Sequence, residues 1–409
     1  MKSKTHKKPG ANNFSNMSFL SFLIEYKWTI LFYLIVCLVV YLNRKKFEIQ
    51  AKIVALHRTK IGINFISRFV KGKEELIKIL GLCGIGLGYI GMLTIFYFLF
   101  QLLYEALQKP TVFTASPVLP GVPIPGLGIN FPLVIGWISL LIIMVIHEFS
   151  HGIVAKAHNQ SINSTGIAFF GPLLGAFVDI DEKKLRKQPD HVQYSILAAG
   201  ANANIITSII FLLLLGFVIS PAISSMEMPA GVRIQVYEDL PAKLSGLENN
   251  DVIVGVDNTA IISTQDFVNI GVKPYQTYTL HTSDGRSIDV TAREHPNNSS
   301  VGQFGIDLSQ ETRLKNASAA NKAWHAVLKW INELLFWLYL IGFSIGLFNF
   351  LPIFITDGAR MLQISLNKMI KNQARAKKVW LFINKLSLLV LLLLFAIPIV
   401  TNIVKFISG

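Results

Sequence analysis

Long uninterrupted apolar runs dominate the hydrophobic pattern of this 409-residue chain. Five of them, at 79–100, 131–157, 194–220, 335–356 and 386–404, are long enough to cross a bilayer core, which takes about 20 residues of helix. A sixth, Trp28 to Leu42, is shorter but can extend into the stretch Met17 to Ile24 upstream. It could be a secretory signal, yet no small-x-small cleavage site follows, and Arg44-Lys45-Lys46 closes it as an anchor. The pattern predicts about six transmembrane helices.

Two stretches interrupt this apolar pattern. Residues 106–132 are rich in proline and glycine, which excludes a regular helix, so we expect an outer loop that could be re-entrant. Residues 228–308 are polar and contain strand-like runs at Val232 to Val236, Val252 to Val256 and Ser287 to Thr291, with turn signals such as Ser283-Asp284-Gly285 between them. We expect a small β-rich domain here, outside the membrane.

The sequence therefore predicts a polytopic α-helical membrane protein with one small β-rich extramembrane domain. We expect four parts along the chain. Residues 1–130 form an N-terminal tail, two transmembrane helices, a basic loop and the Pro/Gly-rich loop. Residues 131–225 and 311–409 form the two halves of a helical core, and residues 226–310 form the β-rich domain between them.

Composition agrees with this class of protein. The chain is 52% hydrophobic and 15% charged, against roughly 45–50% and 25% for a soluble domain. Its net charge of +14 could suggest nucleic acid, but the basic residues cluster beside apolar runs, so we expect no nucleic-acid partner. Cys37 and Cys83 both lie in apolar runs, where we expect buried thiols rather than a disulfide framework or a cysteine metal site.

Lysine and arginine in the short loops predict an orientation, because cytoplasmic loops carry the excess of positive charge. The basic loops at 44–78, 183–187 and 360–378 should face the cytoplasm. The outer side then holds both termini and the β-rich domain. The tail residues Lys2, Lys4, Lys7 and Lys8 are the main evidence against this orientation.

Candidate chemistry is concentrated at the end of the third span, which reads His147-Glu148-Phe149-Ser150-His151. Residues i and i+4 share a helix face, so both imidazoles can converge on one Zn²⁺, while Glu148 can take a proton from the attacking water. In a chain with nine histidines the motif could arise by chance. Ionisable groups inside a span are costly unless they are paired or metal-bound, so the location favours a zinc hydrolase site.

A catalytic zinc ion usually takes three protein ligands. Pro352 should break the helix of the fifth span, and Asp357 is the only acidic residue near that break. In two spans that run in the same direction, His147 and Asp357 should reach a similar depth near the cytoplasmic side. We expect Asp357 to be the third ligand, and the alternative is that it only caps a helix beginning at Gly358.

Together these residues resemble the site-2 protease family of intramembrane zinc metalloproteases. The similarity rests on His147-Glu-x-x-His151 in one span and Asn349-x-x-Pro352-x-x-x-x-Asp357-Gly358 in a later one. It covers most of the chain from Leu133 onward. In that family the two histidines and the aspartate hold one zinc ion and the glutamate is the general base. The resemblance implies these roles for His147, His151 and Asp357 and for Glu148.

The resemblance also implies substrate-binding residues. The segment Gly171 to Asp181 is similar to the family's hairpin, which presents an edge strand to the substrate, and this implies roles for Gly175 and Phe177. The resemblance implies a substrate-binding role for Asn349 of the later motif as well. It implies the same role for Asn204, which lies in a stretch similar to the family's Ala-Gly-Pro-x-x-Asn, although Ala201 replaces the proline.

The β-rich domain resembles a PDZ domain through Pro241-Ala242-x-x-Ser245-Gly246-Leu247-x-x-Asn250-Asp251-Val252-Ile253. Asn250 stands at the usual glycine position, and asparagine tolerates a left-handed backbone. PDZ domains can bind peptides by strand addition. A domain that only filters substrates by size is an equal alternative.

The resemblance implies an intramembrane zinc metalloendopeptidase that cleaves transmembrane segments of single-span membrane proteins in the lipid bilayer. A non-catalytic zinc-binding scaffold or adaptor is the main alternative, although it would not need Glu148 as a base. A metal transporter should carry polar groups across several spans, and the first, second and sixth have almost none. A protease of the prenyl-protein type needs a downstream glutamate ligand, for which the late spans offer no suitable motif. Gly342-x-Ser-x-Gly346 matches a serine nucleophile elbow, but inside a span close helix packing explains it better.

Overall fold

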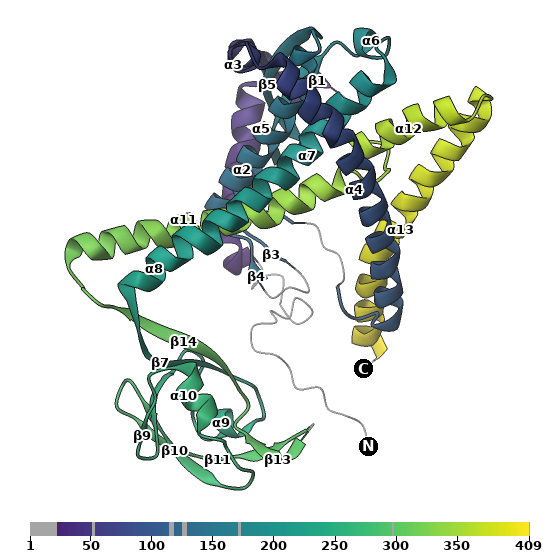
Figure 1. The fold of residues 1–409 in the computed structure, drawn as a ribbon. Coiled ribbons are helices and arrows are strands. Elements are labelled where there is room, and N and C mark those ends of the chain that lie inside the picture. Colours follow the sequence, from purple (N-terminus) through teal and green to yellow (C-terminus); the bar gives the residue numbers. More distant parts are fainter. Residues whose placement is uncertain are drawn as a thin grey trace. The chain divides into compact units, whose positions relative to one another are not determined.

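The computed structural model describes residues 23–50, 54–113, 118–124, 129–170, 173–296 and 298–408 (Figure 1). They form two compact units. One unit holds residues 216–331, and the other holds the described residues before 216 together with those from 332 onward. The predicted N-terminal tail, part of the Pro/Gly-rich loop, and Gly171 of the predicted hairpin lie outside the described residues.

Five helices in the described ranges are long and apolar enough to cross a bilayer, as expected for a multi-pass integral membrane protein. They are α4 (Glu74–Gln108), α5 (Leu133–Ala157), the continuous helix Asp190–Met226, α11 (Ala319–Phe348) and α13 (Gln373–Ser408). The third of these comprises α7 (Asp190–Leu214), a π-helical turn (Leu215–Ile219) and α8 (Ser220–Met226). The first predicted span forms the 16-residue helix α2 (Lys27–Leu42), so a sixth crossing stays a prediction.

The bounds predicted for the fifth span are wrong. Its helix, α11, begins at Ala319 and ends at Phe348, well before the predicted end at Thr356. Residues 349–356 form a bend, and a separate helix, α12 (Asp357–Met369), follows. Pro352 lies inside this bend, where it has no backbone N–H to continue a helix. The bend is largely apolar, so the hydrophobic pattern alone extends the span to Thr356.

The expectation of buried thiols is also wrong. Cys37 on α2 and Cys83 on α4 are both exposed and unpaired. Each lies on a helix face that no other described part of the protein covers. For an apolar helix in a bilayer such a face can be covered by lipid instead of by protein.

A stripe of small residues on α4 sets how closely its neighbours approach. The stripe consists of Gly81, Gly84, Gly88 and Gly91, which repeat at helical spacing. Ser195 of α7 packs directly on Gly81, and the Asn202 side chain donates to the Gly84 carbonyl at 2.7 Å. The ring of Phe350, which is fully buried in the bend after α11, packs on Gly88 and Gly91. One glycine face therefore positions both α7 and the bend that leads to α12.

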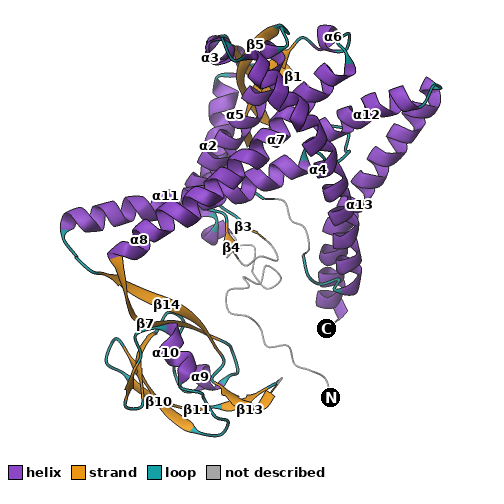
Figure 2. Cartoon of the chain, in the orientation of Figure 1, coloured by secondary structure: helices purple, strands orange, loops and turns teal. Residues whose placement is uncertain are grey.

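A four-stranded antiparallel sheet lies in the same unit (Figure 2). Its order is β1 (Glu48–Gln50), β2 (Val54–Thr59), β5 (Ile162–Phe170) and β6 (Leu173–Ile180). The strand β6 is thus an edge strand, paired only with β5 among the described strands. Strands β1 and β2 lie within the basic loop at 44–78, for which the sequence pattern predicts no strands. They lead into the short amphipathic helix α3 (Ile61–Val70).

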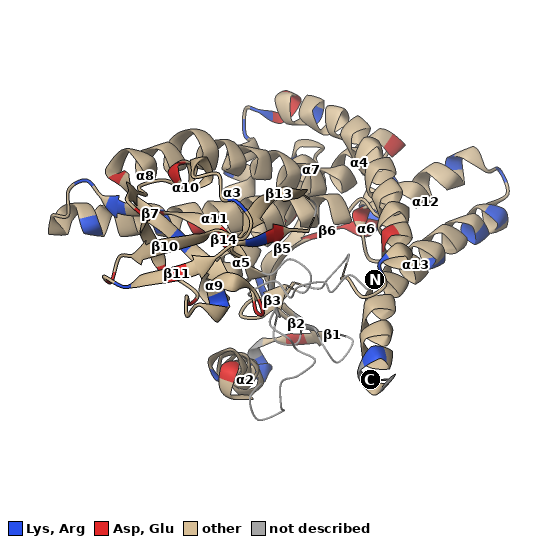
Figure 3. Ribbon diagram, turned by 90° about the horizontal axis from the view of Figure 1, so that it is seen from below, with Lys and Arg blue, Asp and Glu red and all other residues tan. Residues whose placement is uncertain are grey.

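Two ion pairs hold α12 against the chain segment that follows the sheet. Arg360 pairs with Glu182 of the short helix α6 (Glu182–Leu185) at 3.2 Å, and Lys368 pairs with Asp190 of α7 at 3.0 Å. Basic residues gather at the turn between α12 and α13 (Figure 3). Two of the predicted cytoplasmic loops, 183–187 and 360–378, therefore lie beside each other. Which side of the membrane they face stays a prediction.

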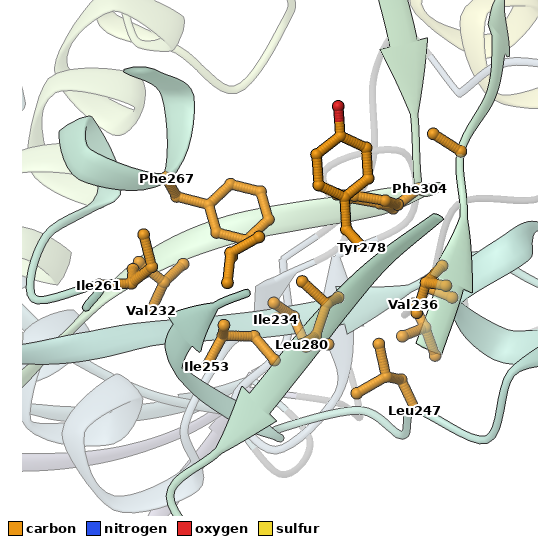
Figure 4. Packing of buried hydrophobic residues seen from close by; sticks show 14 residues of the cluster. Val232, Ile234, Val236, Leu247, Ile253, Ile261, Phe267, Tyr278, Leu280 and Phe304 are labelled. Atoms are coloured by element: carbon orange, nitrogen blue, oxygen red, sulfur yellow. The ribbon is translucent and has the colours of Figure 1, made fainter. Parts of the chain in front are cut away.

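The unit of residues 216–331 is built around a β-sheet with the strand order β11-β10-β8-β7-β14, with β9 (Thr259–Ala260) beside β8. These strands are β7 (Glu227–Val236), β8 (Val252–Val256), β10 (Thr277–Thr282), β11 (Ser287–Thr291) and β14 (Ile306–Leu314). The helices α9 (Pro241–Leu244) and α10 (Thr264–Asn269) and the hairpin β12 (Arg293–His295) and β13 (Asn298–Gln303) complete it. Side chains of β7, β8 and β10 meet Phe267 and Phe304 in one apolar core (Figure 4).

The strands predicted at 232–236, 252–256 and 287–291 all form, and Gly285 turns between β10 and β11 with a φ of 87°. Asn250 has a φ of 74°, the left-handed conformation that was expected of it. The last strand runs past the predicted boundary at 310, to Leu314. These features agree with a small β-rich domain, and its PDZ identity stays a prediction.

Candidate active site

Helix α5 brings the two motif histidines together. His147 and His151 lie one turn apart on the same face, both are buried, and their Nε2 atoms are 3.1 Å apart. Two imidazole nitrogens this close must share either a proton or a cation, because two facing lone pairs repel each other. The spacing expected from the sequence is confirmed.

Asp357 completes the cluster from a distant part of the chain. Its Oδ2 lies 3.3 Å from Nε2 of His147 and 3.2 Å from Nε2 of His151. Nitrogen and oxygen ligand atoms of the three residues all lie within 4.8 Å of one another, and no other such group of three occurs in the described ranges. Asp357, the first residue of α12, lies 206 residues after His151 in sequence, so the fold itself creates this cluster.

The suggestion that Asp357 only caps a helix does not fit the structure. Helix α12 begins at Asp357, and its cap is Thr356, whose side chain accepts from the Ala359 N–H. Gly358 lies so close to the Phe350 carbonyl that a Cβ could not fit, and its N–H donates to the Asn349 carbonyl at 2.8 Å. This backbone bridge closes the bend and aims the Asp357 carboxylate at the histidines.

The remaining imidazole nitrogens have partners that suit a metal site. Nδ1 of His151 lies 2.6 Å from the Ile196 carbonyl, which can only accept, so Nδ1 carries the proton and Nε2 is free to bind a cation. Nδ1 of His147 lies 3.3 Å from the Asn204 amide nitrogen. Turning that amide by 180° would bring its oxygen, which is buried and otherwise unpartnered, to the Nδ1 proton and free the second Nε2.

The donor set fits a zinc ion. Two neutral imidazoles and one carboxylate are common ligands of catalytic zinc, and three protein ligands leave a position for water. Oδ2 of Asp357 is buried and has no hydrogen-bond donor, which is costly for a carboxylate unless a cation balances it. The same three residues are the ligands expected from the sequence.

Glu148 lies between the histidines in sequence and beside the edge strand in space. Its Oε2 accepts from the backbone N–H of Val178 on β6 at 3.1 Å. The proposed base and the edge strand are therefore in direct contact.

The residues expected to bind substrate divide into two groups. Gly175 and Phe177 lie on β6, the strand whose Val178 contacts Glu148, and their contact with substrate stays a prediction. Asn204 is buried with 1% of its surface exposed and contacts His147, so its position is that of a residue that orients a ligand. The Asn349 side chain donates to the Ile345 carbonyl of the preceding helix α11 at 3.0 Å. A substrate contact by either asparagine stays a prediction.

Gly200 is a site residue whose role the sequence did not reveal. It lies on α7 against both imidazoles, and a Cβ there would be 2.8 Å from Nε2 of His147 and closer still to Nε2 of His151. Only a hydrogen atom leaves room for the histidines at this point. The sequence identified Gly200 as part of a motif, but which side chains it faces depends on how α5 packs on α7.

Gly342 and Gly346 of the serine-elbow motif act as spacers between helices. A Cβ on Gly342 would be 2.5 Å from the Ser208 hydroxyl, and one on Gly346 would be 2.9 Å from the Ala201 carbonyl. The Ser344 hydroxyl donates to the Leu340 carbonyl of the same helix at 2.7 Å. These contacts agree with close helix packing.

Comparison with known proteins gives two results. The sequence model of peptidase family M50 matches residues 135–394, more than half of the chain, including all three clustered ligands and Glu148. A relative from Methanocaldococcus jannaschii, described as an uncharacterized protein, is 27% identical over 317 residues, which cover 75% of this chain and 76% of the relative.

Gly200→Ala tests the crowding at the histidines. The added methyl group must displace at least one imidazole, so we expect weaker zinc binding and a loss of hydrolytic activity together, with the helices intact. Metal titration of the purified protein and circular dichroism measure the two effects. Gly86→Ala is the matched control, because Gly86 lies on α4 with no atom near its would-be Cβ. Normal zinc affinity in Gly200→Ala would contradict the proposed geometry.

Proposed function

The chain belongs to peptidase family M50, the site-2 protease family, and we propose that it is an intramembrane zinc metalloendopeptidase that cleaves transmembrane segments of single-span membrane proteins. One observation carries this proposal. His147 and His151 converge with Asp357 in the interior of a helical membrane unit, with Glu148 adjacent. A protein has little reason to bury such a set among apolar helices unless it binds a cation there.

His147, His151 and Asp357 would hold the zinc ion. When bound, zinc supplies Lewis-acid activation of the attacking water and of the scissile carbonyl. Glu148 would accept the proton of that water and pass it to the leaving amine. Ile196 and Asn204 keep the two imidazoles oriented through their Nδ1 atoms.

Substrate would bind as an extended strand along β6. Helices in a bilayer hide their carbonyls in internal hydrogen bonds, so a transmembrane substrate must unwind locally before it can be attacked. The free edge of β6 offers backbone donors and acceptors to such an unwound segment. Because Glu148 contacts Val178 on that edge, a strand bound there would lie beside the base.

A zinc-binding scaffold or adaptor remains the alternative function. It would keep the three ligands but would not need a carboxylate beside an open strand edge. The contact between Glu148 and Val178 favours the protease. A transporter is less well supported, because the small residues of α4 contact other helices instead of lining a polar path.

The β-rich unit could recruit substrates or filter them by size. Its strand β14 is an edge strand, and a cavity of about 390 Å³ lies beside it. Apolar side chains of Leu240, Phe267 and Phe304 line this cavity, with Tyr237 and Asp307 among the polar residues. An edge strand next to a cavity suits an extended peptide and favours recruitment. We further propose that this unit and both termini lie outside, with the metal site near the cytoplasmic side.

Glu148→Gln should abolish cleavage without loss of metal. Glutamine keeps the shape of the side chain but cannot take up the proton, so we expect activity to fall by at least ~100-fold. The assay uses detergent-purified protein, a panel of single-span substrates and zinc analysis. Glu75→Gln, an exposed glutamate at the start of α4, should behave as wild type. Zinc binding by a wild-type protein that cleaves no substrate would favour the scaffold.

Asp357→Asn should lower zinc occupancy and activity together. Asparagine is nearly the same size but lacks the anionic oxygen that a zinc ligand supplies, while Thr356 still caps the helix. Asp239→Asn is the control, since Asp239 is an exposed residue of the β-rich unit, which holds no proposed ligand, and asparagine tolerates its left-handed backbone with a φ of 61°. Full zinc content and normal turnover in Asp357→Asn would exclude Asp357 as a ligand.

A further inference from the structure

Arg58 connects all four strands of the sheet that carries the predicted substrate edge. It lies on β2, and its Nε donates to Glu48 of β1 at 2.7 Å. Its Nη1 donates to the Ser164 hydroxyl of β5 at 2.8 Å and to the Asp179 carboxylate of β6 at 2.6 Å. The side chain therefore reaches across β5 to hold the edge strand.

The geometry of β5 makes this reach possible. Gly166 is the partner of Arg58 in the ladder between β2 and β5, and it is paired with Phe177 on β6. A Cβ at Gly166 would be 2.8 Å from the Phe177 ring and even closer to the His57 carbonyl. With no side chain at Gly166, the Arg58 guanidinium lies over the Phe177 ring, 5.6 Å from its centroid.

Arg58 binds at the point where the ladder between β5 and β6 is irregular. Ile162 pairs with Ile180, but the next pair is Ser164 with Asp179, so β5 contains one extra residue there. Ser164 and Asp179 are the two residues that share Nη1 of Arg58. A fork of planar donors is well suited to fix two neighbouring strands at one relative position.

The register of β6 decides what lies beside Glu148. In the observed register Glu148 accepts from Val178. A slip of β6 by two residues would keep the same side chains on the same face but would bring Ala176 or Ile180 to this point. Gly166 on β5 and Gly175 on β6 provide no side chain that would help to fix this alignment, so other contacts must contribute to it.

We propose that Arg58 is a positioning residue that fixes the register of the edge strand β6 and thereby selects which peptide bond of the substrate reaches the metal site. The proposal rests on the proposed function for its second half, since only a protease has a bond to select. The register itself does not depend on activity. Exposed ion pairs contribute little to stability, so the expected defect is one of alignment and not of folding.

Disulfide trapping tests the register without any substrate. In a background with Cys37→Ser and Cys83→Ser, the pair Ile167→Cys and Ala176→Cys reports the observed register, because these residues are partners. The pair Ile167→Cys and Val178→Cys reports a shift of β6 by two residues, because Val178 would then lie opposite Ile167. When Arg58 is present, we expect a disulfide only between positions 167 and 176. In Arg58→Ala, we expect the disulfide between positions 167 and 178 to form as well. Arg68→Ala, an exposed arginine on α3, is the control.

Mapping of cleavage positions by mass spectrometry tests the consequence. Arg58→Ala should cut the same substrate at its normal position and at bonds two residues away, with KM raised roughly three- to tenfold and kcat within about twofold. Zinc content should be unchanged. Arg58→Lys, which can still reach Asp179 but lacks the fork, should restore most of the normal position. A merely structural role would lower zinc content and kcat instead.

The outcomes separate the two proposals. A wild-type protein that cleaves nothing overturns the proposed function, and the disulfide pairs still decide the register. Exclusive formation of the Ile167–Ala176 disulfide in Arg58→Ala overturns the register proposal. A single unchanged cleavage position with unchanged KM in Arg58→Ala overturns the selection of the bond.

Discussion

Two imidazoles and a carboxylate that lie 3.1–3.3 Å apart in a buried site need a shared cation or proton, partners for the two Nδ1 atoms, and space for the rings. This requirement explains much of the surrounding structure. The Ile196 carbonyl and the Asn204 amide face the two Nδ1 atoms, and Gly200 makes room for the rings. A single added methyl group or a single unpaired donor would be expensive at this point, because buried polar groups without partners are penalised.

The same requirement extends outward through helix packing. Asp357 reaches the histidines because the bend after α11 is closed by Gly358 and filled by Phe350, and Phe350 in turn needs the glycine face of α4. Helices in a bilayer gain little from the hydrophobic effect when they associate, so close contact between small residues carries the packing. The position of the metal ligands therefore depends on the bend after α11, and the bend depends on the glycine stripe of α4.

The sequence predicts the features that are local. Spacing at i and i+4 places His147 and His151 on one face, apolar length identifies five spans, and alternation identifies the strands of the β-rich unit. Asp357 could be inferred as a ligand because it follows a span that runs in the same direction as the span of His147. The two residues should therefore reach a similar depth in the bilayer. Five of the six predicted spans appear as long apolar helices in the described ranges.

Features that depend on distant partners could not be predicted. Pro352 predicts a break in the fifth span, but the end of α11 at Phe348, four residues earlier, coincides with the packing of Phe350 on α4, which no local pattern reveals. Residues 48–59 appeared only as a basic loop, because a pair of short strands becomes recognisable only when β5 is available to pair with β2. The role of Gly200 likewise follows from the approach of α7 to α5 and not from its neighbours in the chain.

Zinc K-edge X-ray absorption on the purified, zinc-loaded protein tests the central claim most directly. The account predicts two imidazole nitrogens at about 2.0–2.1 Å, oxygen ligands at about 2.0–2.2 Å, and no sulfur. A sulfur shell at about 2.3 Å, or a spectrum without imidazole scattering, would contradict a metal centre built from His147, His151 and Asp357.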